Sequence, residues 1–246
     1  MTDTPADDLK PSFRSDVTVE LVKHTASDAD VLFAARVSTL GEQSLDELQK
    51  DPERSKGLIN YLMRDRHGSP FEHNSMTFFV SAPIFVFREF MRHRVGWSYN
   101  EESGRYRELQ PVFYVPDADR KLVQEGRPGK YRFVDGTADQ QELVERAMED
   151  SYRQSYEAYR EMLAAGVARE VARSVLPVGL YSSMYATCNA RSLMHFLGLR
   201  TQHELAKVPS FPQREIEMVG EKMEAEWARL MPLTYAAFNA NGRVAP

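Results

Sequence analysis

The apolar residues of this chain repeat with two different periods, and this mixture limits the folds that it can adopt. Val17, Val19 and Leu21 alternate with polar neighbours, and the runs 76–80 and 180–187 are also typical of strands. Other, longer stretches carry apolar residues at the spacing of one helix face. We predict helices over residues 28–37, 45–66, 83–95, 139–165, 168–175, 189–199 and 213–230. Because strands and helices mix without a regular βαβ rhythm, we predict an α+β fold with mixed helices and a mainly antiparallel sheet.

The sequence shows no linker rich in Gly, Ser or Pro, so we predict a single domain over residues 16–246. Residues 1–15 are polar, which predicts a loose tail without the apolar stretch of an export signal. No apolar run reaches the roughly eighteen residues that a membrane span needs. Residues 116–136 are rich in charge, Gly and Pro, and we expect an exposed excursion there that could act as a lid.

The charge and the cysteine content narrow the class of protein. The formal net charge is −5, so a protein that coats nucleic acid is not expected, and any anion must be bound by local groups of Arg. Cys188 is the one cysteine and can form no internal disulfide, which favours a reducing cytoplasm. The six His are scattered and no CxxC motif is present, so we expect no metal site.

An arginine-rich segment, residues 92–106, begins in the last turn of the predicted helix 83–95 and continues beyond it. Arg grips phosphate through two parallel N–H groups and keeps its charge at any useful pH. Ser103 and Gly104 allow backbone N–H groups to approach an anion closely. The segment is therefore a candidate site for a phosphorylated ligand. The alternative is an exposed charged turn in which the arginines pair with Glu101 and Glu102.

A second segment, residues 189–200, begins with Asn189 as a helix N-cap. Arg191 and His195 are four residues apart and share one helix face. Arg191 near free N–H groups of a helix N-terminus suits a diphosphate, whereas His195 by itself is also explained as a surface histidine. A third segment, residues 67–73, is weak evidence alone, because two His around a turn could simply cap helix ends.

Together these segments resemble the flavin-dependent thymidylate synthase family. The family signature is Arg-His-Arg, then seven or eight residues, then Ser, and here eight residues separate Arg92-His93-Arg94 from Ser103. Residues 103–106 match the S-x-R-Y end of the signature. The small-P-F-E-H, A-R-S-V-L-P and N-A-R-S-L blocks occur in the family's order at residues 69–73, 172–177 and 189–193. The resemblance covers roughly residues 17–240.

The resemblance implies an FAD enzyme that converts dUMP into dTMP, with 5,10-methylenetetrahydrofolate as carbon donor and NADPH as reductant. It implies a homotetramer whose active sites are shared between subunits. The implied cofactor-binding residues are His67, Ser69, Glu72, Arg92, His93, Arg94, Glu101, Asn189, Ala190, Arg191 and His195. The implied substrate-binding residues are Glu89, Phe90, Met91, Arg92, Glu101, Glu102, Ser103, Gly104, Arg105, Arg173 and Arg200. Arg200, the implied catalytic residue, would lie against the uracil and favour its ionised form.

Two features depart from the commonest family pattern. Many members carry Gln where Glu89 stands, which changes the hydrogen bond expected to the nucleotide. The eight-residue spacing, which includes Gly96 and Trp97, is the longer variant of the signature.

Methylation of uracil at carbon 5 needs an activated ring, a carbon donor and a hydride. The better-known thymidylate synthases activate the ring with a cysteine thiolate. Cys188 lies in an apolar run that disfavours a thiolate, so we predict a structural role for it. Reduced flavin can supply the hydride. Ser103 is another possible nucleophile, but no base can be assigned beside it, and we assign it to binding.

Two alternatives carry a different function. A protein that binds RNA or other nucleic acid could use the Arg clusters, although the net charge opposes it. A flavoprotein of the same fold could oxidise NADPH without methyl transfer. No GxGxxG or Walker A motif is present, so FAD would be held by side chains and helix ends. The main hypothesis requires Arg92, Arg191 and Arg200 to converge, in one chain or in the oligomer.

Overall fold

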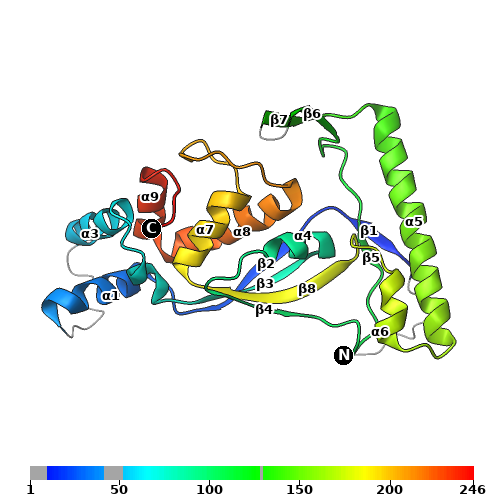
Figure 1. Cartoon of the computed structure of the whole chain (residues 1–246), viewed down its shortest axis with the longest axis horizontal. Helices are drawn as coiled ribbons and strands as arrows, with labels where there is room; N and C mark the ends of the chain where they lie inside the picture. Colours follow the sequence, from blue (N-terminus) through cyan, green and yellow to red (C-terminus); the bar gives the residue numbers. More distant parts are fainter. Residues whose placement is uncertain (1–9, 42–51, 128–129) are drawn as a thin grey trace. The chain divides into compact units, whose positions relative to one another are not determined.

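The computed structural model describes residues 10–41, 52–127 and 130–246 (Figure 1). Its internal contacts divide the chain into two compact units. We call them the α5 unit, with segments up to Asp16 and over residues 82–87 and 101–183, and the α7 unit, with residues 17–81, 88–100 and 184–246. The segments alternate along the chain, so no single cut separates the units, in line with the absence of a linker. The single domain over residues 16–246 stays a prediction.

The elements that lie within the α7 unit are β2 (Thr18–His24), α1 (Asp28–Leu40), α3 (Pro52–Arg64), the 3-10 helix η2 (Ser69–Glu72), α7 (Ala190–Arg200), α8 (Arg214–Leu230) and α9 (Pro232–Ala240). The elements that lie within the α5 unit are β1 (Ser12–Arg14), β5 (Val112–Tyr114), β6 (Val123–Arg127), β7 (Lys130–Val134), α5 (Ala138–Ala164), α6 (Arg169–Ala172) and the 3-10 helix η3 (Arg173–Val175). Four elements have residues in both: β3 (Met76–Pro83), α4 (Ile84–Phe90), β4 (Trp97–Glu101) and β8 (Tyr181–Cys188).

The main sheet has four strands in the order β2-β3-β8-β4. Strand β2 runs antiparallel to β3, with Val19 opposite Val80. Two further ladders belong to the α5 unit: β1 pairs with β5 in parallel, and β6 forms an antiparallel hairpin with β7. The predicted fold class, mixed helices with a mainly antiparallel sheet, is confirmed.

Two helices of the α7 unit, α1 and α7, begin where the sequence supplies a cap. Ser27 precedes α1 and its backbone N–H donates to the Asp30 carboxylate at 2.7 Å, which satisfies an otherwise free amide. Asn189 precedes α7, and its side-chain oxygen accepts from Ser192 N at 2.9 Å. Helix α7 is buried along most of its surface, with Leu193, Phe196 and Leu197 fully covered, and it packs against α8 (Figure 1). These contacts hold the predicted cofactor-binding helix rigidly.

The α5 unit has its own apolar core. Tyr152, Tyr156 and Tyr159 lie on one face of α5 and pack against Phe113 of β5 and Leu180. Phe113 and Tyr152 stack with ring centroids 4.8 Å apart. Helix α5 begins at a capping box between Thr137 and Gln140, close to the predicted start at residue 139.

Several predicted elements need correction. The helix predicted over 83–95 ends at Phe90, because the chain turns and Gly96, with a φ of 70°, leads into β4. Ser12–Arg14, assigned to the loose tail, form β1, and residues 1–9 lie outside the described residues. Residues 116–136 are largely exposed, as predicted, but contain the regular hairpin β6–β7. The 45–66 helix is confirmed as α3 from Pro52, and residues 45–51 lie outside the described residues.

Candidate functional site

The Arg-His-Arg segment lies along helix α7, so two segments that are distant in the sequence meet within the α7 unit. The guanidinium of Arg200 donates from Nε to His93 Nε2 at 3.1 Å and forms an ion pair with Glu89. Further along, Ser192 Oγ donates to the carbonyl of Val95 at 2.9 Å. Gly96 is needed at this point, because a Cβ there would lie 2.1 Å from Ser192 Oγ. The segment carrying Arg92 and the helix carrying Arg191 and Arg200 are thus brought together in one unit. The convergence of the three guanidinium groups on one ligand stays a prediction.

Aromatic rings fill the space between that segment and the helix. Phe90 is fully buried, with its ring centroid 4.7 Å from Phe196 and 5.3 Å from Trp97. Tyr99 donates its hydroxyl to the carbonyl of His93 at 2.7 Å, which fixes the turn after α4. Phe90 was a predicted substrate-binding residue; its side chain belongs to this aromatic core, so only its backbone is left to line a pocket.

His93 is held in its neutral form. Burial is the largest cause, followed by the positive charges of Arg200 and His195, and together they lower the pKa of His93 from 6.5 to about 4. A neutral imidazole has one unprotonated nitrogen, and Nε2 accepts the hydrogen bond from Arg200. His93 therefore positions the Arg200 guanidinium without adding a second positive charge beside it.

Arg191 is oriented by groups from two other parts of the α7 unit. Its Nη1 lies 2.5 Å from Glu72 Oε1 of η2, and its Nε donates to the backbone oxygen of Pro246 at 2.7 Å. Gly68 packs against this pair, since a Cβ at Gly68 would lie 2.5 Å from Arg191 Cζ and 2.8 Å from the Pro246 oxygen. His195, on the same helix, has a lowered pKa because of burial first and then Arg191.

The free N–H groups expected at the start of α7 are mostly occupied, which corrects one prediction. Ala190 N donates to Asn74 Oδ1 at 2.8 Å, and Ser192 N donates to the Asn189 side chain. Ala190 is fully buried, so its side chain does not reach a ligand. Anion binding at this helix therefore depends on the Arg191 side chain more than on backbone amides.

The turn of residues 67–72 supplies the remaining predicted cofactor residues. His67 is exposed and its ring stacks on Tyr61, with centroids 5.5 Å apart. Ser69 begins η2 and is exposed, while Phe71 is fully buried and anchors the turn. Element η2 packs against α7, so these residues and Arg191 belong to one local cluster.

The α5 unit gathers the other predicted substrate-binding residues. Residues 103–107 form a turn in which Arg105 N donates to Ser103 Oγ at 3.2 Å. Gly104 is buried, and a Cβ there would lie 3.2 Å from Arg173 Cδ, so the glycine lets the turn and Arg173 approach each other. Arg105 pairs with Glu170 at 3.0 Å. Ser103–Arg105 and Arg173 are thus brought together, and their role in nucleotide binding stays a prediction.

Two acidic residues of this turn have partners that the sequence did not indicate. Glu101 accepts a hydrogen bond from Ser182 Oγ at 2.7 Å, and Glu102 lies 3.7 Å from Arg107. Although Glu101 is exposed over part of its surface, desolvation of its carboxylate is the largest effect and raises its pKa, against the lowering effect of Ser182. Ser182 and Glu170 carry no sequence signal that would have selected them.

Arg92 and Arg94 are exposed and differ from the partnered arginines. Within the described part of the α7 unit, neither forms an ion pair with a carboxylate. The alternative in which the arginine-rich segment is a self-neutralised turn is therefore not supported for these two residues. Unneutralised guanidinium groups next to the turn after α4 fit a ligand that carries several negative charges, such as a dinucleotide.

Cys188 ends strand β8 and is buried, with 3% of its surface exposed. Burial raises the pKa of its thiol well above the usual range. Its environment disfavours a thiolate, as the sequence indicated.

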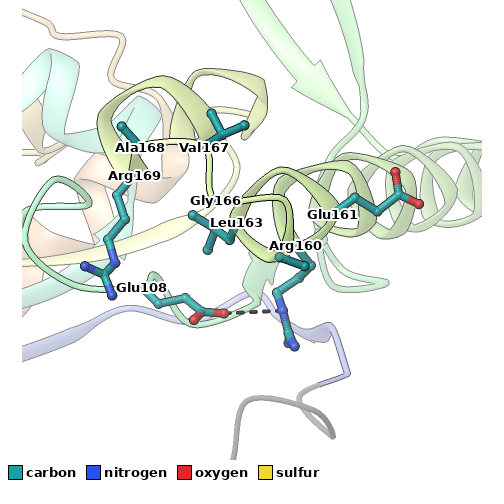
Figure 2. A pocket seen from close by; sticks show the side chains of 9 residues that line it. Glu108, Arg160, Glu161, Leu163, Gly166, Val167, Ala168 and Arg169 are labelled. Carbon is teal, nitrogen blue, oxygen red and sulfur yellow. Dashed lines mark ion pairs between the residues drawn. The ribbon is translucent and has the colours of Figure 1, made fainter.

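A separate hollow of about 650 Å³ lies at the junction of α5 and α6 in the α5 unit (Figure 2). Glu108 and Arg160 form an ion pair of 3.4 Å at its wall. None of the predicted site residues lines it.

Among the described residues, no three His, Cys, Asp or Glu side chains gather as a metal site would require. No helix in the described ranges combines the length and apolar character needed to cross a membrane.

Comparison with known proteins identifies the family. Residues 20–233 match the family described as thymidylate synthase complementing protein. A flavin-dependent thymidylate synthase of Streptomyces avermitilis is 90% identical over 246 residues, covering 100% of both chains. One from Tropheryma whipplei strain TW08/27 is 58% identical over 240 residues, covering 97% of this chain and 98% of the relative.

A solved structure agrees with these relatives. It is the crystal structure of the UMP/dUMP methylase PolB from Streptomyces cacaoi bound with 5-Br dUMP, with 59% identity and a TM-score of 0.89. The match covers 95% of this chain and 99% of that chain. The chain belongs to the thymidylate synthase complementing protein family, the family of the flavin-dependent thymidylate synthases, as the sequence motifs predicted.

Proposed function

We propose that this enzyme methylates dUMP at carbon 5 to give dTMP, with FAD as cofactor, 5,10-methylenetetrahydrofolate as carbon donor and NADPH as reductant. The observation that carries the proposal is the packing of the Arg-His-Arg segment against α7, which brings that segment together with the helix of Arg191 and Arg200 in one unit. The nucleotide analogue bound by the PolB methylase, 5-Br dUMP, supports the choice of a uracil nucleotide. The names of the 90% and 58% identical relatives favour thymidylate as the product.

The described residues fit FAD as a multiply charged ligand. Arg92 and Arg94 would supply positive charge at its phosphates, and Arg191, held by Glu72, would present its remaining N–H groups. Bound flavin would supply the hydride that reductive methylation needs. His93, being neutral, would leave the charge of this region to the arginines.

The nucleotide phosphate would bind at the turn of Ser103, Gly104 and Arg105, together with Arg173. Gly104 allows this turn to lie against the Arg173 side chain, and the Arg105 guanidinium is steadied by Glu170. Ser103 Oγ accepts from Arg105 N, so the hydroxyl shapes the turn. This arrangement supports a binding role for Ser103 instead of a nucleophilic one.

Arg200 would lie against the uracil and stabilise negative charge that develops on the ring. A guanidinium fixed before the reaction can lower the barrier by several kcal/mol, because it need not reorganise as charge develops. Glu89 and the neutral His93 hold Arg200 in place. Glu89 thereby has a positioning role, and its carboxylate is engaged before any nucleotide binds.

We propose that no cysteine attacks the ring. Replacing Cys188 with Ala should leave the rate of dTMP formation within about threefold of the original, because the buried thiol has no route to a thiolate at neutral pH. Activity is measured at saturating dUMP, and the folded fraction is checked by circular dichroism. Loss of more than about a hundredfold in a folded Cys188→Ala protein would contradict the proposal.

The purified protein tests the function directly. It should be yellow with bound FAD and should release tritium from [5-³H]dUMP only when the folate and a reductant are present. UMP is the comparison substrate, because PolB is described as a UMP/dUMP methylase. Unchanged NADPH oxidation without dUMP or folate would favour the flavoprotein alternative, and binding of generic RNA with steep salt dependence would favour the nucleic-acid alternative. We also propose the homotetramer with shared sites and the cytoplasmic location.

A further inference from the structure

Residues 243–246 are held unusually firmly for a segment that follows the last helix. Among the described residues, only Arg66 and Arg243 combine a side chain with a left-handed backbone, with φ values of 65° and 54°. A non-glycine residue in this conformation is strained, and it persists only where other contacts enforce it. Arg243 belongs to this segment and donates from it to Thr201, whereas Arg66 lies outside the segment and donates to its Val244 carbonyl.

Arg243 anchors the start of the segment in the interior. Its side chain is 1% exposed and pairs with Glu224 of α8 at 2.5 Å. It also donates to Thr201 Oγ1, the residue after α7, at 3.1 Å, and to Asn239 Oδ1 at 2.8 Å. The backbone passes close to α7, since a Cβ at Gly198 would lie 3.2 Å from the Arg243 carbonyl oxygen. The anchor therefore ties the segment to both α7 and α8.

Arg66 holds the middle of the segment. Its Nη1 donates to the carbonyl of Val244 at 2.7 Å and to the carbonyl of Ala245 at 2.9 Å. The side chain is exposed, so these two bonds are what orders it. Arg66 directly precedes His67 and Gly68, the turn that packs against Arg191.

The end of the segment reaches the proposed flavin site. The backbone oxygen of Pro246 accepts from Arg191 Nε at 2.7 Å, while Glu72 pairs with Nη1 of the same guanidinium. Gly68 leaves no space for a Cβ beside them. Two acceptors on different edges of one planar guanidinium fix its rotation and leave its other N–H groups for a ligand.

We propose that residues 243–246 and Arg66 form a positioning element for Arg191, which presets this guanidinium for an anionic group of the cofactor. The contact between the element and a predicted ligand-binding side chain is the hydrogen bond from Arg191 Nε to Pro246, so its members are positioning residues. The identity of the ligand in this inference rests on the proposed function. The ordering of Arg191 by the segment does not depend on that function.

The central test is Arg66→Asn, because Asn tolerates the left-handed backbone while losing the reach to the two carbonyls. We expect FAD to bind the flavin-free protein about tenfold more weakly, measured by quenching of flavin fluorescence, since two hydrogen bonds from a charged donor are lost. The affinity for dUMP should change less than about twofold. Arg229→Ala is the matched control, because it removes an exposed, paired arginine of the same unit that lies outside the element; it should change neither affinity.

A double-mutant cycle separates positioning from a general structural effect. In an Arg191→Ala background, Arg66→Asn should change FAD affinity by less than about twofold, because its effect acts through Arg191. Equal losses in both backgrounds would overturn the proposal. Deletion of residues 244–246 provides a second variant that does not alter Arg66, and it should reproduce the loss of FAD affinity.

Hydrogen exchange of the flavin-free protein tests the element without any ligand. Amides of residues 66–68 and of the first turn of α7 should exchange faster in Arg66→Asn and in the deletion variant than in the original protein. If the original protein does not bind FAD, the proposed function fails, and exchange alone then decides the positioning role. Unchanged exchange in both variants would overturn the inference whatever the cofactor is.

Discussion

The neutral state of His93 makes a quantitative prediction about stability in acid. The ring is half-buried between the turn after α4 and helix α7, and the positive charges of Arg200 and His195 add to the effect of burial. Its pKa is lowered to about 4, whereas an unfolded chain protonates His near 6.5. The unfolded state therefore binds more protons than the folded state over this range. The resulting stabilisation is complete above about pH 6.5 and is lost as the pH falls towards 4.

The size of the effect follows from these two pKa values. At pH 5 nearly every unfolded chain carries a proton on His93, but only about a tenth of folded molecules do. The linkage relation then gives a loss of about 2 kcal/mol in the free energy of unfolding between pH 8 and pH 5 from this residue alone. Other groups also titrate in this interval, so the prediction concerns a difference between two proteins.

The comparison is between the original flavin-free protein and His93→Gln, whose side-chain oxygen can replace Nε2 as an acceptor for Arg200. Urea unfolding is followed by tryptophan fluorescence at pH 8 and pH 5, since both tryptophans, Trp97 and Trp227, lie in the α7 unit. The loss of stability on acidification should be about 2 kcal/mol smaller in His93→Gln. His24→Gln, at an exposed position on β2, is the matched control and should lose as much stability as the original protein.

Equal losses in the original protein and in His93→Gln would refute the reasoning. They would mean that the ring is protonated in the folded state as readily as in the unfolded one. The hydrogen bond from Arg200 to His93 Nε2 would then not exist in solution, because a protonated imidazole has no free acceptor.

Two further predictions follow from single contacts. Ser103→Ala should raise the KM for dUMP by about three- to tenfold and lower kcat by less than about threefold, because the hydroxyl accepts from Arg105 N and shapes the turn. Abolished turnover with unchanged dUMP affinity in steady-state assays would show instead that Ser103 is the nucleophile. Asp28→Ala should lower the free energy of unfolding by about 2 kcal/mol in urea titrations, because Asp28 accepts from Leu233 N, Thr234 N and Thr234 Oγ1 at the start of α9. A change in this free energy below about 0.5 kcal/mol would contradict the capping role of Asp28.

The sequence predicted those elements whose signals are local. Helix α7 was placed within a residue at each end because Asn189 caps it and an apolar stripe runs along it. Strand β3 was recognised from its apolar run, and the start of α5 from the polar turn before it. In these segments the local preference and the tertiary packing agree, so the pattern alone is sufficient.

The elements that the sequence did not predict depend on distant partners. Strand β1 has three residues and exists because it pairs with β5, about a hundred positions away in the chain. Helix α9 is capped by Asp28, which no local pattern relates to residue 233. The helix before the Arg-His-Arg segment ends early because Tyr99, on the following strand, donates its hydroxyl to the carbonyl of Phe90 at the helix end and to that of His93 in the turn. The roles of Glu170, Ser182 and Pro246 were not predicted for the same reason, because each contacts a site residue that is distant in the sequence.

The partnered and unpartnered arginines divide the work of the proposed site. Arg191, Arg200 and Arg105 each pair with one carboxylate, from Glu72, Glu89 and Glu170 respectively. The Arg105 and Glu170 side chains are 53% and 56% exposed, and a pair in this setting contributes at most about 1 kcal/mol to stability. Stability is therefore a weak reason for the Arg105–Glu170 pair, whereas orientation is a strong one, because a carboxylate on one edge of a guanidinium directs the other edge.

The cost of such orientation is a reduced local charge, since each pair is neutral overall. Arg92 and Arg94, which have no carboxylate partner within the described part of their unit, would restore it. This division predicts different ionic-strength effects on ligand affinity. Loss of Arg92 or Arg94 should weaken the salt dependence of binding, because exposed charges are screened. Replacing Glu72 with Gln should reduce affinity but steepen that dependence, because it leaves the Arg191 charge without its carboxylate partner. A site in which both kinds of substitution changed the salt dependence equally would not use its arginines in this way.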